Sequence, residues 1–308
     1  MNREQPAPPR IAVIGPGKVG TTLAILLERS RLHVDWFGAR DPARAAEAAS
    51  YLVRPPAVCP PEEAVREADL VLLTVQDDAI EPVCSALAKA GGVRPGSAWL
   101  HCSGALPGSV MANALHHFGC PVGSMHPLQT FPTVEAGVAR LPGALVACEG
   151  EPNAVSLALR LAKAIGGRPI QIGSDRKQLY HAAAVLACNG LVALVDAALT
   201  LTNAAGLPES DARAGLSTIL ETTLDNIERL GTTAALTGPA ARGDAATLNL
   251  QYAALRSENG PVLAELYRAI NLQALAIAQR SGRLTLEQAE KARSALTPSG
   301  TGDLAQRR

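Results

Sequence analysis

Residues 11–20 read Ile-Ala-Val-Ile-Gly-Pro-Gly-Lys-Val-Gly, and this stretch decides the fold. Its four leading apolar residues are typical of a buried parallel strand, and the apolar residues of 21–27 predict a helix directly after it. Between them, Gly15, Gly17 and Gly20 form a GxGxxG motif. In such a motif the first glycine permits a tight turn, the second lets a pyrophosphate approach the backbone, and the third lets the helix pack on the strand. The stretch therefore predicts a dinucleotide-binding α/β domain.

The same motif predicts the first half of a cofactor site. Free N–H groups at the start of the helix would face the phosphates. We therefore expect cofactor contacts from a run of six residues: Gly15, Pro16, Gly17, Lys18, Val19 and Gly20. Residues 68–75 predict another buried strand. Ligands of such sheets bind at the carboxyl ends of the strands. Val75 and Gln76 are therefore expected to border the cofactor. A plain glycine-rich turn is the alternative, but here the motif has both its strand and its helix.

A strand is also predicted at residues 33–37, and the residues that follow it indicate which cofactor binds. An NAD-specific site holds the ribose hydroxyls with an acidic residue at this point. This chain has Gly38-Ala39-Arg40 there, with Arg44 one turn further on. Guanidinium groups pair with the 2′-phosphate of NADP(H), whereas an acid would repel it. The sequence therefore favours NADP(H); the alternative is that both arginines are merely solvated residues at a helix start.

The remaining pattern predicts two domains. Further strands are expected at 98–104, 121–127, 143–148 and 168–172, with a helix at 154–164, so the nucleotide-binding domain spans 1–172. From residue 173 to 308 helical patterns prevail, at 175–206, 210–230, 245–256, 260–281 and 285–295. We expect a doubly wound Rossmann sheet followed by an all-α C-terminal domain. The first of these helices is apolar nearly all round and must be surrounded, which favours a homodimer formed through the helical domain.

Composition narrows the class of protein. The 308 residues are 47% hydrophobic and carry zero net charge, so nothing favours nucleic-acid binding. The most apolar run, 182–201, is interrupted by polar residues, and no membrane association is expected. Residues 1–10 do not resemble a signal peptide. The six cysteines have no metal-site spacing, so we expect reduced thiols, no metal and a cytoplasmic location.

Two groups of residues are candidates for chemistry. Lys177, His181 and Asn189 are spaced to lie roughly on one face of an otherwise apolar helix. Lys177 or His181 could donate a proton to a carbonyl oxygen, and Asn189 could orient the substrate. The alternative is that Lys177 is solvated and that the other two bond to neighbouring helices. Ser103 and His126 form the second group, at the ends of two predicted strands, where serine could bind substrate or cofactor and histidine could move a proton.

Four motifs resemble a known bacterial family. They are HCSGAL at 101–106, GSMHPLQTFP at 123–132, KQLYHAAAVLACN at 177–189 and LTGPAARGD at 236–244. The family has a Rossmann-like domain followed by a domain of unknown function, DUF2520. More distantly, the chain is similar to the 6-phosphogluconate dehydrogenase-like superfamily, which includes ketopantoate reductases, β-hydroxyacid dehydrogenases, pyrroline-5-carboxylate reductases and prephenate dehydrogenases. The helical half is then expected to be like the C-terminal domain of 6-phosphogluconate dehydrogenase.

The resemblance implies site residues and a class of reaction. Ketopantoate reductases and β-hydroxyacid dehydrogenases carry a catalytic Lys-x-x-x-Asn; here Lys177 matches the lysine, and His181 stands where the asparagine would be. Ser103 and His126-Pro127 resemble the serine and His-Pro of prephenate dehydrogenases. The resemblance implies NADPH-dependent reduction of a small, anionic keto acid, ketopantoate-like, or of a related carbonyl or imine. The alternatives are a prephenate- or arogenate-like dehydrogenase and a non-catalytic sensor that binds NADP(H).

Overall fold

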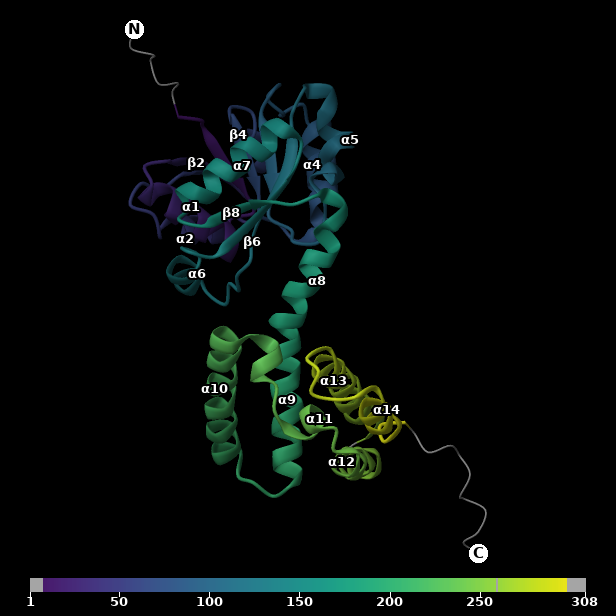
Figure 1. The fold of residues 1–308 in the computed structure, drawn as a ribbon. Helices are drawn as coiled ribbons and strands as arrows, with labels where there is room; N and C mark the ends of the chain where they lie inside the picture. The colour runs from purple at the N-terminus through teal and green to yellow at the C-terminus, as the bar shows by residue number, and fades with distance from the viewer. Residues whose placement is uncertain (1–7, 259, 298–308) are drawn as a thin grey trace, which may run out of the picture. The chain divides into compact units, whose positions relative to one another are not determined.

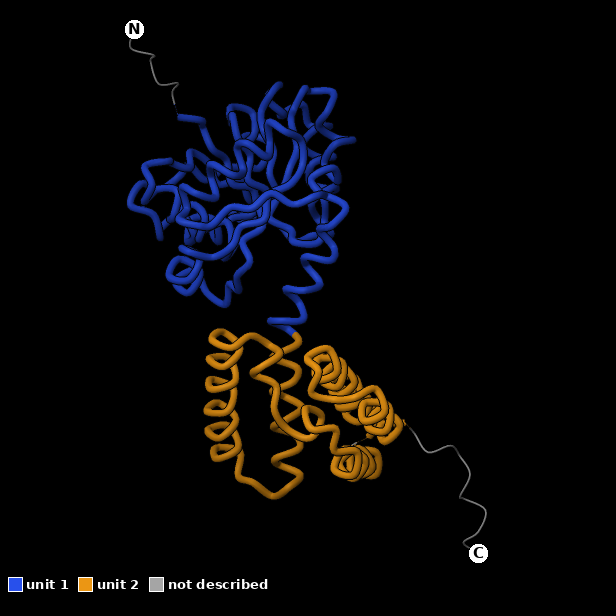
Figure 2. The backbone as a smooth tube through the Cα atoms, viewed as in Figure 1, with its two compact units in different colours: residues 1–189 blue, residues 190–308 orange. Residues whose placement is uncertain are grey.

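The computed structural model describes residues 8–258 and 260–297. The chain divides into two compact units, Met1–Asn189 and Gly190–Arg308 (Figure 2). The last strand of the sheet ends at Gln171, and the helix that follows it still groups with the first unit up to Asn189. Each unit has its own hydrophobic core.

The first unit is built on an eight-stranded sheet with the order β3-β2-β1-β4-β5-β6-β7-β8 (Figure 1). The strands are β1 (Ile11–Ile14), β2 (Val34–Gly38), β3 (Ala57–Cys59), β4 (Leu70–Leu73), β5 (Ala98–His101), β6 (Val122–Pro127), β7 (Leu145–Gly150) and β8 (Arg168–Gln171). Neighbouring strands are parallel except β6 and β7, which are antiparallel. The predicted doubly wound Rossmann sheet is confirmed.

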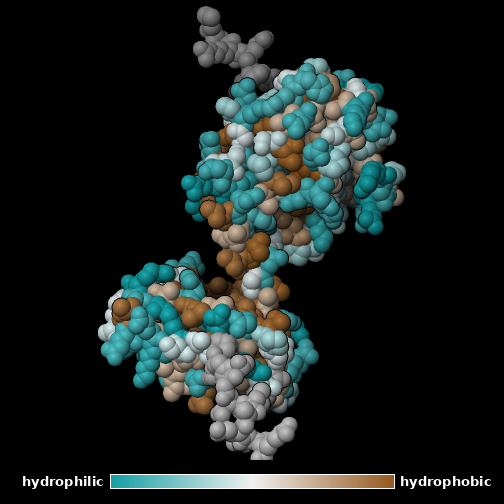
Figure 3. Space-filling view, turned by 90° about the vertical axis from the view of Figure 1, so that its right-hand side faces the viewer, coloured by the Kyte–Doolittle hydropathy of each residue, from teal (hydrophilic) through white to brown (hydrophobic). Residues whose placement is uncertain are grey.

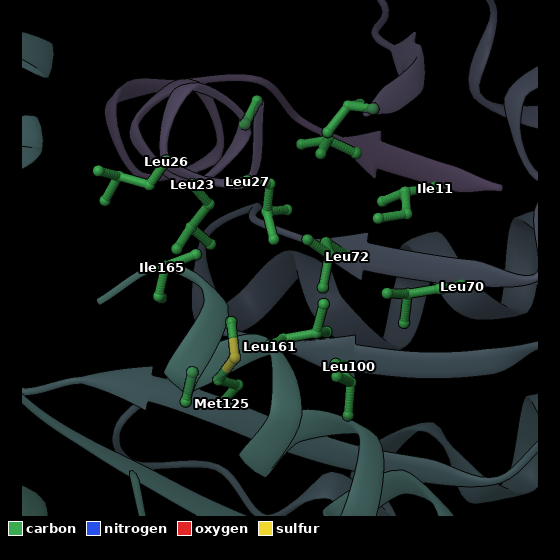
Figure 4. Close-up of a cluster of buried hydrophobic side chains, with 14 of the residues drawn as sticks. Ile11, Leu23, Leu26, Leu27, Leu70, Leu72, Leu100, Met125, Leu161 and Ile165 are labelled. Carbon is green, nitrogen blue, oxygen red and sulfur yellow. The ribbon is translucent and has the colours of Figure 1, made fainter. Parts of the chain in front are cut away.

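Helices cover both faces of this sheet. They are α1 (Lys18–Arg29), α2 (Pro42–Ala49), α3 (Pro61–Ala64), α4 (Ile80–Lys89), α5 (Ala112–Leu115), α6 (Val134–Arg140) and α7 (Pro152–Ala164). Successive residues of a strand point to opposite faces. Leu70 and Leu72 of β4 therefore pack with α1 and α7 in one cluster (Figure 4), whereas Val71 and Leu73 pack with α3, α4 and α5 in the other.

The long helix expected over 175–206 is interrupted. The structure has α8 (Lys177–Ala187) and α9 (Asn189–Ala204), separated at Cys188, whose ψ of −72° departs from the helical value. The second unit continues with α10 (Glu209–Ala235), α11 (Gly238–Arg242), α12 (Ala245–Glu258), α13 (Gly260–Arg280) and α14 (Leu286–Ser294). The predicted all-α C-terminal region is confirmed. Helix α10 runs past the expected end at residue 230 and is broken at Gly231, which has a φ of +74°.

The helical unit leaves much of its apolar surface uncovered. Its core is formed mainly by α11 to α14, and Ala212 is the one buried residue of α10. Ile219 and Leu230 of α10 are 61% and 54% exposed. The segment Ser174–Ala204 is long and apolar enough to cross a membrane, by length and composition alone, and none of its apolar window is buried. The sequence alone predicts no membrane-spanning segment here, because polar residues interrupt the apolar run. Apolar side chains are visible on the surface in Figure 3. Surfaces of this kind mark sites of association.

Candidate active site

A cavity of about 1080 Å³ lies at the carboxyl ends of β1, β2 and β4. Its size is that of a cofactor site. Seven of the residues predicted to bind cofactor line it: Gly15, Pro16, Gly17, Arg40, Arg44, Val75 and Gln76. Of the other three, Lys18 is exposed at the start of α1, Val19 packs against the core, and Gly20 is buried at the contact between α1 and the sheet. The cavity and the glycine-rich turn therefore fit a dinucleotide.

The glycine-rich turn has the geometry that the motif requires. Gly15 has a φ of +80°, in the left-handed region that favours glycine, and its N–H donates to the Gly38 carbonyl at 2.9 Å. A Cβ on Gly20 would collide with the side chains of Thr74 and Val13, so glycine is needed where α1 approaches the sheet. A Cβ on Gly17 would meet no protein atom within 4 Å. Gly17 faces open space at the start of α1, where phosphates bind helix N–H groups.

The arginines at the end of β2 are available to an anionic ligand. Asp41 caps α2, accepting the Ala43 and Arg44 N–H groups at 3.1 and 3.2 Å. Its carboxylate also lies 3.4 Å from Arg44, but both side chains are largely exposed, so this ion pair contributes little. Arg40 is exposed and makes no hydrogen bond or ion pair among the described residues. The carboxylate of Asp41 therefore caps α2, and the guanidinium groups of Arg40 and Arg44 are exposed to solvent at the cavity.

Lys177 is buried in an ion pair rather than exposed to a ligand. It is the first residue of α8 and is 1% exposed, as is its partner Glu149 of β7. Its ammonium donates to Glu149 at 3.1 Å and also to the hydroxyl of Ser124 in β6. Glu149 in turn accepts from Ser124 at 2.6 Å, from Ser174 at 2.5 Å and from the Gly108 N–H at 2.8 Å. The network therefore attaches the start of α8 to strands β6 and β7.

Charge and burial act together in this network. Burial lowers the pKa of Lys177, and the nearby Glu149 carboxylate opposes that shift. Burial alone would raise the pKa of Glu149, but hydrogen bonds from Ser124 and Ser174 and the Lys177 charge hold it below its usual value. Each charge therefore favours the ionised form of the other group. A buried pair of this kind is costly to break from one side.

Three ring side chains meet at the carboxyl ends of β5 and β6. His126 is the second-last residue of β6, and its Nδ1 lies 3.0 Å from the hydroxyl of Tyr180 in α8. The rings of Tyr180 and His181 both pack edge-on against His126, with centroids 5.5 and 5.6 Å away. Burial, reinforced by His181 and Lys177, lowers the pKa of His126 to about 4, and burial raises the pKa of Tyr180 to about 12. At neutral pH the imidazole is therefore uncharged and the phenol protonated.

Gly104 makes room for this cluster. A Cβ at position 104 would lie 2.8 Å from Nε2 of His126 and closer still to Nδ1 of His181. The two ring nitrogens therefore lie on either side of the space next to Gly104, and no direct hydrogen bond joins them. Nδ1 of His181 is buried and has no hydrogen-bond partner in the described residues. A buried polar atom without a partner is costly, and it marks a place where a ligand or water would bind.

The structure places the two remaining candidates outside this cluster. The hydroxyl of Ser103 accepts from the Ala105 and Leu106 N–H groups at 3.2 and 3.0 Å, so it shapes the loop after β5. Asn189 is exposed beyond the break at Cys188, and no hydrogen bond of its side chain occurs in the described part of the chain. Sequence reasoning missed Tyr180, Glu149 and Gly104. Tyr180 and Gly104 stand inside quoted motifs, next to His181 and Ser103, and that adjacency was the available signal.

Two family models match the chain. A Rossmann-like domain matches residues 2–127, and DUF2520, a domain of unknown function, matches residues 144–274. The chain carries a Rossmann-like domain followed by DUF2520. A comparison with curated protein sequences gave no match. The predicted resemblance to a family with a Rossmann-like domain followed by DUF2520 is confirmed.

Solved structures share the fold at low sequence identity. A Thermotoga maritima protein has a TM-score of 0.68 and 22% identity, with 89% of this chain and 100% of that chain covered. A candidate NADP oxidoreductase from Bacteroides fragilis has a TM-score of 0.70 and 21% identity, covering 87% and 98%. A reductive aminase from Aspergillus terreus, solved with NADPH and ethyl-5-oxohexanoate, has a TM-score of 0.63 and 17% identity, covering 90% and 94%. A cytoplasmic location is compatible with this fold.

Proposed function

We propose that this protein is an NADPH-dependent oxidoreductase that reduces a small, anionic keto acid or a related carbonyl or imine. One observation carries the proposal. The cofactor-sized cavity at β1, β2 and β4 and the cluster of His126, Tyr180 and His181 lie along the same carboxyl edge of one sheet. In open α/β sheets that edge holds the dinucleotide and the substrate. The reductive aminase and the NADP oxidoreductase named above have the same fold, which supports the kind of reaction but not the substrate.

The proposed roles follow from the geometry of the site. His126 and His181 face each other where a proton must be supplied, and an imidazole side chain can both accept and donate a proton. Burial lowers the pKa of His126 and Lys177 adds to this shift, but the lysine charge is balanced by Glu149 in the buried pair. Ser103 holds the loop after β5 in place. Asn189 as an orienting group stays a prediction, as does the use of Lys177 itself as the acid.

The cofactor preference gives a first prediction. NADPH should bind about tenfold to a hundredfold more tightly than NADH, because a charge-assisted contact from Arg40 to the 2′-phosphate contributes roughly 1.5–3 kcal/mol. Arg40→Ala should remove most of that difference and leave NADH binding unchanged. Calorimetric titration of both nucleotides measures it. Arg29→Ala is the matched control, because Arg29 is the last residue of α1 and lies at the end of that helix away from the glycine-rich turn. Equal affinities of the unaltered protein for NADPH and NADH would refute the preference.

A dehydrogenase of the prephenate or arogenate type is the second candidate. The observation that favours it is the pairing of a site histidine, His126-Pro127, with a lysine that is buried away from ligands. The two candidates differ in direction. A reductase should consume NADPH when keto acids or imines are added. A dehydrogenase should reduce NADP⁺ when carboxylated cyclic dienes that carry a hydroxyl group are added. Measuring both rates separates the two candidates. NADPH binding with turnover in neither direction would instead favour the sensor.

Assembly gives a second prediction. We propose that a second copy of the chain covers the exposed apolar faces of α8, α9 and α10, because a monomer would leave Leu186, Val192 and Ile219 between 61% and 75% exposed. Sedimentation at low micromolar concentration should give twice the chain mass of 31.9 kDa. Ile219→Asp should shift the protein toward monomer, whereas Leu286→Asp, at an equally exposed position of α14, should not. A monomer without detergent, or solubility only with detergent, would contradict the dimer.

A further inference from the structure

Tyr180 is a polar side chain for which the sequence analysis found no role. It lies in α8, next to His181, and its ring is half-buried. Its hydroxyl is 3.0 Å from Nδ1 of His126, and no other hydrogen bond of this hydroxyl occurs among the described residues. The phenol therefore has one fixed partner on the protein and retains a second bonding position for a ligand.

The surroundings of Tyr180 place it at the reactive end of the site. His126 is the second-last residue of β6, and Gly104 follows β5, at the same edge of the sheet as the β4 residues that line the cofactor cavity. A dinucleotide bound along the glycine-rich turn extends its nicotinamide along that edge. On the other side of His126, Nε2 faces Nδ1 of His181 across the space that Gly104 leaves free. Tyr180 and His126 are thus joined by a hydrogen bond, and His181 lies on the other side of His126 without a direct hydrogen bond to it.

We propose that Tyr180 delivers the proton to the substrate, with His126 and His181 as its relay. The proposal rests on the proposed reductase function and adds the residue that touches the substrate. The high pKa of Tyr180 keeps the phenol protonated near neutral pH, and the low pKa of His126 keeps the imidazole neutral, so a proton can be passed along the pair without charging either group beforehand.

The step balances as follows. A bound NADPH would supply the hydride, which adds to the carbonyl or imine carbon. The oxygen or nitrogen atom that keeps the electron pair of the broken π bond takes the proton of the Tyr180 hydroxyl. His126 gives its Nδ1 proton to the phenolate oxygen and gains a proton at Nε2 from His181 through one bridging water. His181 then regains a proton from solvent, so the reaction consumes one hydride and one proton.

The hydrogen bond between Tyr180 and His126 can be tested without turnover. In the full chain labelled with ¹⁵N-histidine, His126 should be the Nδ1–H tautomer, identified by the signals that His126→Gln removes. Tyr180→Phe should shift the Nδ1 resonance, whereas Tyr51→Phe, at an exposed position, should not. An unchanged His126 spectrum in Tyr180→Phe would overturn the relay.

Turnover tests the role of the phenol. With any carbonyl or imine that the unaltered protein reduces, Tyr180→Phe should lower kcat about a hundredfold to ten-thousandfold and leave NADPH affinity within threefold. Its residual rate should rise as pH falls, because solvent must then supply the proton, and a merely structural role would not produce this profile. Unaltered turnover in Tyr180→Phe overturns the inference alone. If the unaltered protein reduces no carbonyl or imine, the proposed function fails and the inference fails with it.

Discussion

Lys177→Ala is expected to lower the free energy of unfolding by about 3–5 kcal/mol, the cost of leaving one charge of a buried pair without its partner. Lys177 and Glu149 are both 1% exposed. After the substitution the Glu149 carboxylate keeps its bonds from Ser124, Ser174 and Gly108 but loses the cation that balances it. Unfolding in urea, followed by circular dichroism, measures the loss.

Two matched variants make this result specific. Arg213→Ala breaks the exposed pair with Glu209 in α10 and should cost no more than about 0.5 kcal/mol. Lys177→Met combined with Glu149→Gln removes both charges and keeps an acceptor for Ser124, so it should recover much of the stability. A loss in Lys177→Ala no larger than that in Arg213→Ala would contradict the structural role. If the double variant folds but its turnover falls a hundredfold or more, Lys177 takes part in the chemistry as the sequence first suggested.

His126→Ala is expected to lower turnover about a hundredfold to ten-thousandfold, the usual contribution of a positioned proton-transfer group. The variant removes the hydrogen-bond partner of Tyr180 and the ring that packs against His181, while the cofactor cavity at β1, β2 and β4 keeps its lining. NADPH affinity should therefore stay within a few-fold. The measurement is the rate of NADPH consumption with an accepted substrate.

His117→Ala, at an exposed position of the same unit, is the control and should leave the rate unchanged. A His126→Ala rate within twofold of the unaltered protein would remove His126 from the reaction in both the reductive and the oxidative readings.

The position of the glycine-rich turn and of the strand ends beside it could be predicted because the information for it is local. Gly15, Gly17 and Gly20 are fixed by the turn itself, and a run of apolar residues followed by a helix is enough to place them at the edge of a parallel sheet. Arg40 and Gln76 follow directly from the ends of their strands. These residues line the cavity because their positions depend on neighbours in sequence.

The catalytic half depends on contacts between distant residues, which one sequence does not reveal. The sequence does not show that Glu149 lies beside Lys177, because the two residues are 28 positions apart and the carboxylate belongs to strand β7. Lys177 begins α8 and Asn189 begins the next helix, about 18 Å away at the rise of a helix, so a shared helical face does not bring them to one site. Tyr180 could not be recognised from the sequence, because its role depends on a contact with His126, which is 54 residues away in the chain.

A crystal structure of the protein with NADP⁺ bound tests the central claim most directly. The account predicts the 2′-phosphate against Arg40, the pyrophosphate on the N–H groups at the start of α1, and the nicotinamide ring next to His126 and Tyr180. A nicotinamide ring that points away from His126 and Tyr180, with another set of polar groups around its reactive carbon, would contradict it.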